Sequence, residues 1–404
     1  MDMQKKSLHV TIVGAGFAGV RAALELAKDV TASITLISER NEFQYYPTLY
    51  SSATGHSHLE SWMPLGEIFA DHPNVHVFID SITDIDATHK HLTAASGTTY
   101  EYQTLIFAIG VVTKYFGIPG LETYAYGIKS ELEIKRLKQR LFIDIAEKHH
   151  VDKNYVIIGA GPTGVELAAA MGTYIRRLCA HYGVRRHNVS IRLVEASPRI
   201  LPRSSEMTSR RVAKRLRTLG VKVETNKRVE KENAAELIVS GDPVESHTVI
   251  WTSGVTNHPF FAKHPDVFRL MPNGRVEVDV YLRAADDIFV IGDNAATPYT
   301  GLAQTALHNA DYVAHTIHTL HAGQTPKLYH PRLPVQAIPI GQHWAVIEWR
   351  FIHIYGWLGA IIRRLADLHG YTMLLPVHTA FGAWFAANIH EDDYFAPTLK
   401  RTRD

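Results

Sequence analysis

Two glycine-rich turns stand out because each could hold a pyrophosphate. The stretches VGAGFAG and IGAGPTG both follow an apolar run and precede a helical pattern. In such a turn the first glycine makes the tight bend, the second lets the main chain approach the phosphates, and the third lets helix and strand pack closely. The phosphates then lie at the positive end of the helix. These glycines are Gly14, Gly16 and Gly19 in the first turn, and Gly159, Gly161 and Gly164 in the second.

Each turn is followed by an acidic residue at the end of the next predicted strand. Glu39 ends ITLISE and Glu195 ends IRLVE. A carboxylate in this place accepts hydrogen bonds from ribose hydroxyls, so each unit predicts a dinucleotide site. The alternative is that each glutamate is only a solvated strand end. The interval before Glu195 is longer than usual, which a long helix extended by HYGVRRHN would explain.

The charge of Glu195 also favours one nicotinamide dinucleotide over the other. A carboxylate would repel the 2′-phosphate of NADPH, so we expect NADH in the second site. Arg192 and Arg199 lie nearby in the sequence and weaken this argument, because an arginine can accept that phosphate.

The elements that must position these residues form two α/β units about 145 residues apart. The first is predicted as a strand over 10–13, a helix over 18–28 and a strand over 34–38. Short β segments from NVHVFID onward then suggest an inserted meander that turns near Gly97, and the apolar strand TLIFAIGV follows. The second unit begins near Tyr155 and ends with the apolar strand HTVIWTSGV.

Length and composition set further limits. The 404 residues suit two or three domains, and 46% hydrophobic with 20% charged residues indicates globular cores. The net charge of +2, without a basic tract interleaved with aromatic residues, predicts no nucleic-acid partner. A single cysteine, Cys179, excludes a disulfide framework, a cysteine-based metal cluster and a dithiol redox pair. The histidines are scattered, so we predict no metal site, and we interpret HIHTLH as a solvated helix end.

The pairing of two such units resembles the flavoproteins with two dinucleotide-binding domains. DDIFVIGDNAA supports this, because in that family a strand ends in Gly-Asp and the aspartate contacts the flavin; here the pair is Gly292 and Asp293. The alternative is a β-turn that begins with aspartate. The resemblance implies FAD in the first unit and a nicotinamide dinucleotide in the second. Members that use a dithiol, the disulfide reductases and the sulfide:quinone oxidoreductases, are excluded by the single cysteine.

Within that group the chain resembles the type II NADH dehydrogenases, the single-subunit, non-pumping NADH:quinone oxidoreductases. The matching stretches are YYPTLYSSATG, LIFAIGVVTKYFGIPGLE, GAGPTGVELAAAM, WTSGV, RLPVQAIPIGQHWAVIEW and YGWLGAIIRRLADL. The resemblance implies an α/β fold with two Rossmann-like domains, for FAD and for NADH, and a C-terminal membrane-associating helical segment. We expect the FAD domain over 1–118 and 270–330, the NADH domain over 119–269, and the anchoring or dimer region over 331–404. It also implies cofactor contacts at Glu39, Arg40, Gly110, Gly254 and Ala303.

One motif departs from the family pattern. The family's quinone motif is Ala-Gln-x-Ala-x-Gln after a proline, whereas this chain has AQTALH after Leu302. Gln304 matches the first glutamine, and His308 replaces the second. A histidine can still donate a hydrogen bond to a quinone, and unlike glutamine it can carry a proton. Alternatively, Gln304 and His308 merely share one face of a helix.

Glu166 follows the third glycine of the second turn and is the family's glutamate at this place. One turn into the helix, it could point toward the nicotinamide and flavin rings. We interpret it as an orienting group or a proton carrier in quinone reduction. The alternative is that it only stabilises the helix N-terminus, which is worth about 0.3–1 kcal/mol.

The C-terminal region contains a candidate membrane anchor. An apolar stripe of Ile354, Leu358, Ile361, Leu365 and Leu368 is predicted on one helix face, with Arg363 and Asp367 opposite, and four of the six tryptophans lie in this region. Such a stripe can instead cover the protein's own core or a dimer partner. If it is an anchor, deletion from about residue 345 would release the protein from membranes and leave flavin bound. No run is apolar enough to span a bilayer, and no signal peptide is expected.

The predicted function is therefore transfer of a hydride from NADH to FAD and of two electrons to a membrane quinone, menaquinone or ubiquinone, without proton pumping. We expect a peripheral homodimer on the cytoplasmic side of the cell membrane. Two alternatives stay open: an NAD(P)H flavoprotein reductase with a soluble electron acceptor, and a low-turnover, flavin-bound NADH sensor that resembles the apoptosis-inducing-factor relatives.

Overall fold

A six-stranded sheet forms the centre of the first domain. The computed structural model describes residues 7–184 and 189–391. In the strand order β19-β20-β9-β1-β2-β5, β1 pairs in parallel with both β2 and β9. The chain order reverses at β1, so a crevice is expected at the carboxyl end of this strand. The strands are β1 (His9–Val13), β2 (Ser33–Ser38), β5 (Val75–Ile79), β9 (Thr104–Phe107), β19 (Arg283–Ala285) and β20 (Ile288–Val290).

The two faces of this sheet are covered differently. Helices α1 (Phe17–Ala27) and α9 (Ala303–His321) pack together over one face, where Val10 and Ile12 of β1 are fully buried. The other face packs against the predicted meander, which turns at Gly97. The meander strands are β6 (Ile82–Asp86), β7 (His91–Ala94) and β8 (Thr99–Glu101). NVHVFID does not join them: it contains β5, which pairs in parallel with β2.

The second domain repeats this plan with a four-stranded parallel sheet in the order β13-β12-β11-β17. The long helix expected after the second glycine turn is present as α6, with 20 residues, whereas residues 185–188 of its expected extension lie outside the described residues. An antiparallel three-stranded sheet, β14-β15-β16, is added to the domain. The strands are β11 (Asn154–Ile158), β12 (Ser190–Val194), β13 (Val221–Glu224), β14 (Val229–Glu232), β15 (Glu236–Val239), β16 (Asp242–Glu245) and β17 (Thr248–Trp251); the helices are α5 (Glu131–Ala146), α6 (Pro162–His181) and α7 (Glu206–Thr218).

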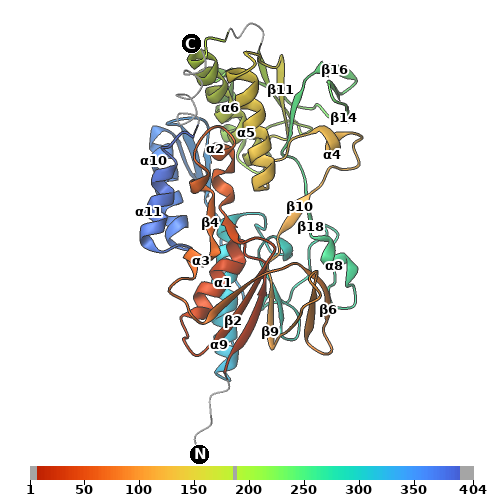
Figure 1. Ribbon diagram of the computed structural model, residues 1–404, viewed down its shortest axis with the longest axis vertical. Coiled ribbons are helices and arrows are strands. Elements are labelled where there is room, and N and C mark those ends of the chain that lie inside the picture. Colours follow the sequence, from red (N-terminus) through yellow and green to blue (C-terminus); the bar gives the residue numbers. More distant parts are fainter. Residues whose placement is uncertain (1–6, 185–188, 392–404) are drawn as a thin grey trace, which may run out of the picture.

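The domains lie one above the other along the long axis, and a two-stranded antiparallel ribbon runs between them (Figure 1). Its strands are β10 (Val111–Thr113) and β18 (Val255–Asn257). Directly after β18, Phe260 and Phe261 of α8 (Pro259–Lys263) pack against Phe107 of the first domain. The predicted boundary at 269/270 is therefore wrong, because the first domain's core already resumes at α8.

The C-terminal region lies along one side of both domains (Figure 1). It contains the sheet β21-β22-β23 and two helices, so the predicted two-strand segment has a third strand. Ile338 and Val346 are buried in the second domain's core, while Tyr371 and Leu374 are buried in the first domain's core. The elements are β21 (Gln336–Pro339), β22 (Ala345–Trp349), β23 (Ile352–Gly356), α10 (Trp357–Thr372) and α11 (Val377–Ala386). Residues 392–404 of the predicted region lie outside the described residues.

Shorter elements complete the path of the chain. They are β3 (Glu42–Gln44), β4 (Trp62–Pro64), α2 (Leu49–Ser52), α3 (Leu65–Ile68) and α4 (Leu121–Tyr124), together with 3-10 turns at Tyr46–Thr48, His58–Glu60 and Gly292–Asn294.

Candidate active site

The first glycine turn has the geometry of a pyrophosphate cradle. Gly14 has a φ of +103°, and a Cβ there would lie 2.4 Å from the carbonyl oxygen of Ala108. A Cβ at Gly19 would lie 1.8 Å from the carbonyl oxygen of Gly14. Both positions therefore need glycine for packing. At Gly16, by contrast, a Cβ would meet no protein atom within 4 Å, which leaves open space at the start of α1 for a phosphate to approach.

The second turn repeats this geometry. Gly159 has a φ of +102°, and a Cβ there would lie 2.0 Å from Oγ of Ser253. A Cβ at Gly164 would lie 1.8 Å from the carbonyl oxygen of Gly159, whereas at Gly161 it would meet no atom within 4 Å. The chain therefore has two similar cradles, each at the start of a helix that follows the central strand of its sheet.

The two acidic residues after the turns differ in how they are held. The carboxylate of Glu195 accepts hydrogen bonds from the main-chain N–H of Ala160, inside the glycine turn, and of Ser197, at 2.7 and 2.8 Å. Glu39 is exposed and accepts a hydrogen bond from the hydroxyl of Ser81 at 2.7 Å. Arg40 is also exposed and donates to Oε1 of Gln44 at 2.6 Å. Only Glu195 is thus fixed by the turn itself.

The two arginines near Glu195 are engaged elsewhere. Arg192 donates to both carboxylate oxygens of Glu224, at 2.9 and 2.7 Å. Arg199 donates to the carbonyl oxygens of Pro202 and Ser204, at 2.6 and 2.7 Å. Both guanidinium groups therefore have hydrogen-bond partners other than Glu195.

Residues 292–294 of the first domain form a network of hydrogen bonds near its glycine turn. Gly292 has a φ of +66° and donates its N–H to Asn309, and Asp293 accepts the N–H of Gly301 at 3.1 Å. Burial raises the pKa of Asp293. The side chain of Asn294 binds both the N–H and the carbonyl of Gly110, at 2.8 and 2.6 Å. This arrangement ties the end of β9 to the Gly-Asp segment.

Lys129 is a residue that the sequence reasoning missed. Its Nζ is buried without a hydrogen-bond partner in the described part of the chain. Burial lowers its pKa, and the nearby carboxyl groups of Glu133 and Asp293 oppose that shift. A buried ammonium group without a partner is costly unless a bound ligand accepts its hydrogen bonds, so this group fits an acceptor-rich cofactor beside Asp293. An isolated lysine in the sequence carries no such signal.

Gly254 has a packing reason to be glycine. A Cβ there would lie 2.4 Å from the ring of Phe116 and 2.8 Å from the carbonyl oxygen of Lys114, and its φ is +78°. The position closes the ribbon between the domains, because the N–H of Lys114 binds the carbonyl of Gly254. A cofactor contact at Gly254 stays a prediction.

Glu166 lies in a largely enclosed cluster with groups from other parts of the chain. Burial raises its pKa to about 8, and the positive charge of Arg363 opposes this shift. Arg363, only 8% exposed, reaches inward from α10, forms an ion pair with Asp367 and donates to the carbonyl of Pro47 at 3.2 Å. The half-buried Tyr50 also lies within the electrostatic influence of Arg363 and Glu166. With this pKa, Glu166 is mostly protonated at neutral pH and can donate a proton.

Gln304 and His308 lie on one face of α9, and both bind main-chain groups. The amide of Gln304 donates to the carbonyl of Val335 at 2.8 Å and accepts the N–H of Val335 at 3.0 Å. Nε2 of His308 lies 2.9 Å from the carbonyl oxygen of His330. Ala303 begins the helix. The shared helix face is thus confirmed, while a quinone contact by either side chain stays a prediction.

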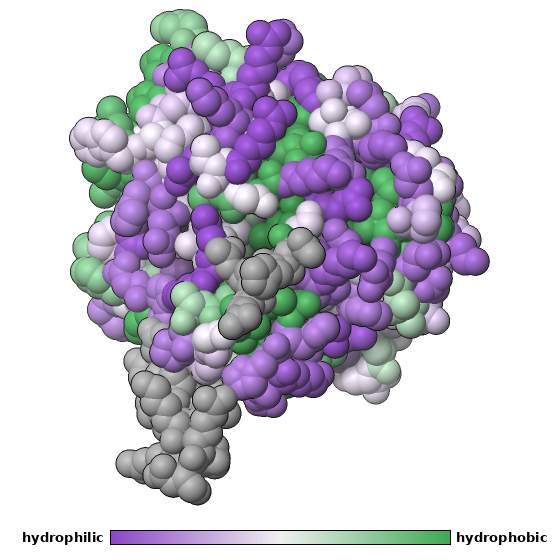
Figure 2. All heavy atoms as spheres, turned by 90° about the horizontal axis from the view of Figure 1, so that it is seen from above, coloured by the Kyte–Doolittle hydropathy of each residue, from purple (hydrophilic) through white to green (hydrophobic). Residues whose placement is uncertain are grey.

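The C-terminal helices expose many apolar side chains. Ile354 lies in strand β23 and not in the helix, so the predicted stripe is wrong at this end. Leu358, Ile361 and Leu365 of α10 are 45–55% exposed, while Arg363 faces inward. We call the following exposed set the apolar face: Trp349, Phe351, Ile352, Trp357, Leu358, Ile361, Leu365, Val377, Phe381, Phe385 and Ile389. In Figure 2, hydrophobic residues gather at the left rim, the side on which α10 and α11 lie in Figure 1.

Residues 7–184 and 189–391 contain no candidate membrane-spanning helix and no candidate metal-binding cluster. No helix there is long and apolar enough to cross a membrane. No group of three or more histidine, cysteine, aspartate or glutamate side chains within the same ranges is arranged to hold a metal ion.

Comparison with known proteins places the chain in a family. Residues 8–310 match the pyridine nucleotide-disulphide oxidoreductase family. The type II NADH:quinone oxidoreductase of Staphylococcus epidermidis is 30% identical over 80% of this chain and 85% of its own length, and that of Staphylococcus aureus is 29% identical over the same shares.

Solved structures share the fold. NDH2 from Plasmodium falciparum in complex with NADH has a TM-score of 0.84 at 19% identity, covering 96% of this chain and 99% of that one. The sulfide:quinone oxidoreductase of Aquifex aeolicus has a TM-score of 0.77 at 19% identity, covering 94% and 92%. Together with the two cradles, these matches show that the chain belongs to the pyridine nucleotide-disulphide oxidoreductase family and, within it, to the type II NADH:quinone oxidoreductases.

Proposed function

We propose that this protein is an FAD-dependent NADH:quinone oxidoreductase that acts at a membrane surface without pumping protons. The observation that carries the proposal is the pair of matched glycine cradles, with open space at Gly16 and Gly161, in a chain with a single cysteine. FAD, when bound, supplies the chemistry that accepts a hydride from NADH and gives two electrons to a quinone. Without a dithiol, electrons leave the flavin directly.

The chain's own residues bind and orient the two dinucleotides. The first cradle, with Asp293 and Lys129, holds FAD, and Glu39 and Arg40 lie where its adenosine end would reach. The second cradle holds NADH, and the fixed carboxylate of Glu195 binds the ribose hydroxyls. Because Arg192 and Arg199 are engaged elsewhere, Glu195 disfavours the 2′-phosphate of NADPH.

Quinone reduction consumes two protons, and Glu166 is placed to supply one. Its carboxyl group is protonated at neutral pH and faces the charge of Arg363. Gln304 and His308 lie near the start of α9. Their side chains orient the quinone after their hydrogen bonds to residues 330–335 break. The quinone is a membrane quinone such as menaquinone or ubiquinone.

The apolar face is the membrane-contacting surface. Its tryptophan, phenylalanine and leucine side chains suit the interface of a bilayer, and the ion pair of Arg363 with Asp367 on α10 is largely buried. This arrangement makes the enzyme peripheral, and we place it on the cytoplasmic side of the cell membrane, where it meets NADH. A second copy of the chain could cover part of the same face in a homodimer, so vesicle binding and oligomeric state should be measured together.

A spectroscopic titration tests the activity. The purified protein should show flavin absorbance that bleaches with NADH and returns when a menaquinone or ubiquinone analogue is added anaerobically. A ferredoxin-like protein that reoxidises the flavin faster than either quinone would favour the soluble-acceptor alternative. Bleaching without reoxidation by any acceptor would favour the sensor, and a colourless protein that cannot take up FAD would refute the proposal.

A further inference from the structure

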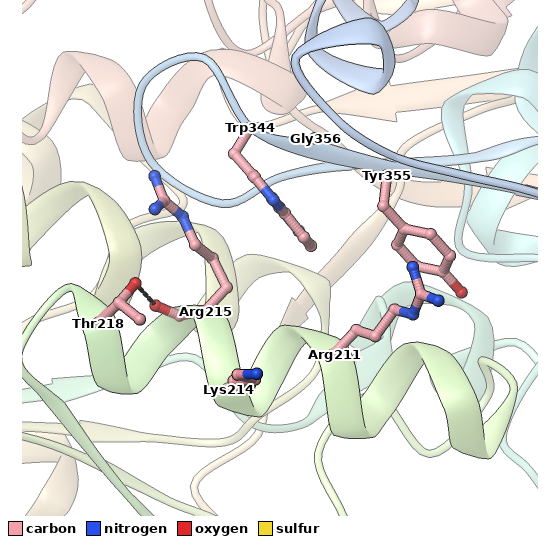
Figure 3. Close-up of a pocket in the computed structure, with 7 residues that line it drawn as sticks. All are labelled: Arg211, Lys214, Arg215, Thr218, Trp344, Tyr355 and Gly356. Atoms are coloured by element: carbon pink, nitrogen blue, oxygen red, sulfur yellow. Dashed lines mark hydrogen bonds between the residues drawn. The ribbon is translucent and has the colours of Figure 1, made fainter.

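A basic pocket opens between α7 and the C-terminal sheet, apart from both glycine cradles. It has a volume of about 400 Å³. Arg211, Lys214 and Arg215 reach it from successive turns of α7, while Trp344 and Tyr355 form the opposite wall (Figure 3). Arg211 shares one helix face with Lys214 and Arg215, which lie three and four residues later, and all three side chains line the pocket.

These cations have no carboxylate partner in the described part of the chain. The guanidinium of Arg211 lies 4.4 Å from the centre of the Tyr355 ring, and Nε of Arg215 makes one long bond of 3.4 Å to the carbonyl of Ile340. The nearest acidic residue on the helix, Glu206, pairs with Arg210 instead. Three like charges around one cavity repel each other unless an anion joins them.

The helix dipole does not account for this cluster. A basic residue near the end of α7 stabilises the exposed carbonyls there, which explains Arg215 and Arg217. Arg211 and Lys214 lie a full turn or more before the last residue of the helix, where the dipole effect has largely faded. Their position instead suits a ligand with an oxyanion, such as a phosphate group.

The residues at the mouth of the pocket indicate the chemistry of the rest of the ligand. Gly356 lines the pocket, and the next two residues, Trp357 and Leu358, belong to the apolar face with 68% and 45% exposure. A phosphate held by α7 would therefore lie beside a surface that suits acyl chains. We propose that this pocket binds the phosphate headgroup of an anionic phospholipid whose acyl chains lie along the apolar face. The proposal rests on the proposed membrane contact, and it adds a specific lipid class to it.

Vesicle flotation tests this inference with a charge-matched pair of variants. The pocket variant is Arg211→Gln with Lys214→Gln. The control is Arg210→Gln with Arg217→Gln, which removes two positive charges from the same helix outside the pocket. Each protein is floated with phosphatidylcholine vesicles and with vesicles that also contain phosphatidylglycerol.

The wild type should bind the phosphatidylglycerol vesicles more tightly than the neutral ones. The pocket variant should lose at least about tenfold more of this preference than the control, because only its two substitutions remove basic groups that line the pocket. Binding to neutral vesicles and NADH oxidation with a water-soluble quinone should be unchanged in both variants. If both variants lost this preference equally, the binding would depend on diffuse surface charge, and the proposed headgroup site in the pocket would be wrong.

A second measurement separates a lipid from a free phosphate. Short-chain, water-soluble phosphatidylglycerol should raise the melting temperature of the wild type but not of the pocket variant. If inorganic phosphate gave the same shift at the same concentration, the site would be for a soluble anion and the lipid assignment would be wrong. A wild type that fails to oxidise NADH with quinone but keeps its lipid preference would refute the proposed activity and leave this site standing.

Discussion

Arg363 of α10 and Glu166 of α6 lie close enough that the charge of the arginine opposes the rise in pKa that burial imposes on the glutamate. Arg363 in turn is held by Asp367 one turn later on the same helix. A segment with an apolar outer surface thus places Arg363 and Asp367 near the carboxyl group of Glu166 in the second domain. This relationship leads to the first prediction.

Replacing Glu166 with Gln should slow quinone reduction on the order of a hundredfold, as expected for loss of a general acid, while flavin reduction by NADH changes little. In the wild type, quinone reduction should fall as the pH rises through about 8, because the carboxyl group loses its proton there. The variant should lack this decline. Stopped-flow absorbance measures both half-reactions; equal slowing of both, or of neither, would remove the proton-carrier role.

Glu195 should govern the choice between NADH and NADPH. Glu195→Gln keeps the size of the side chain and removes its charge. The KM for NADH should rise about 10- to 150-fold, since a hydrogen bond to a charged group contributes roughly 1.5–3 kcal/mol, while the KM for NADPH should fall. Steady-state kinetics with both nucleotides gives the ratio. An unchanged ratio would show that Glu195 does not contact the ribose.

Alanine substitutions at two glycines of the first turn should affect different properties, FAD binding at Gly16 and stability at Gly19. Gly16→Ala places a methyl group in open space, so the protein should fold normally but bind FAD poorly. Gly19→Ala forces a contact with the carbonyl of Gly14 and should destabilise the fold by about 1–3 kcal/mol. Flavin content and the melting temperature of each apoprotein separate the effects. Normal FAD content in Gly16→Ala would argue against a pyrophosphate at this turn.

Glu60 should make stability depend on pH. It is 1% exposed and burial raises its pKa to about 8, so the folded protein retains a proton that the unfolded chain releases above its ordinary carboxyl pKa. Stability should therefore fall as the pH rises from about 4.5 to about 8. Glu60→Gln mimics the protonated form, so thermal melts should agree with the wild type at low pH and exceed it at high pH. Parallel curves would exclude this role.

The apolar face should tolerate charge without unfolding. Leu358→Glu and Leu365→Glu alter side chains that are 45% and 55% exposed, so stability should change by no more than about 0.5 kcal/mol. Both variants should lose vesicle binding. Leu320→Glu, at a similarly exposed leucine near the end of α9, is the matched control and should still bind. A variant that stays on vesicles but changes its oligomeric state would make this surface a subunit interface.

The local features could be predicted from the sequence, because a glycine turn between a strand and a helix has one geometry wherever it occurs. The turns at Gly14 and Gly159, and the glutamate at 195, lie as expected. A short alternating run such as NVHVFID does not reveal which strand it pairs with, so the sequence alone predicts it as part of the meander. In the structure it contains β5, which extends the main sheet.

Features that depend on distant contacts could not be predicted. Lys129 is isolated in the sequence, and its charge faces Asp293, far along the chain, as well as the nearby Glu133. Arg363 was expected only to lie opposite the apolar stripe, and nothing local shows that this side is the interior. The domain boundary at 269/270 was too late because two phenylalanines after β18 pack with Phe107, a contact that the sequence does not display.

Deletion of the chain from about residue 345 would not act on the membrane contact alone. It removes Val346 from the core of one nucleotide domain, and Tyr371 and Leu374 from the core of the other. The single-residue changes on the apolar face therefore replace it as the test of anchoring.

The same packing couples the unfolding of the two nucleotide domains. Because this segment contributes buried side chains to both cores, its unfolding exposes apolar surface in both domains. Heating should accordingly melt the molecule in one calorimetric transition, with loss of flavin and loss of helix at the same temperature, even though each half resembles a module able to stand alone.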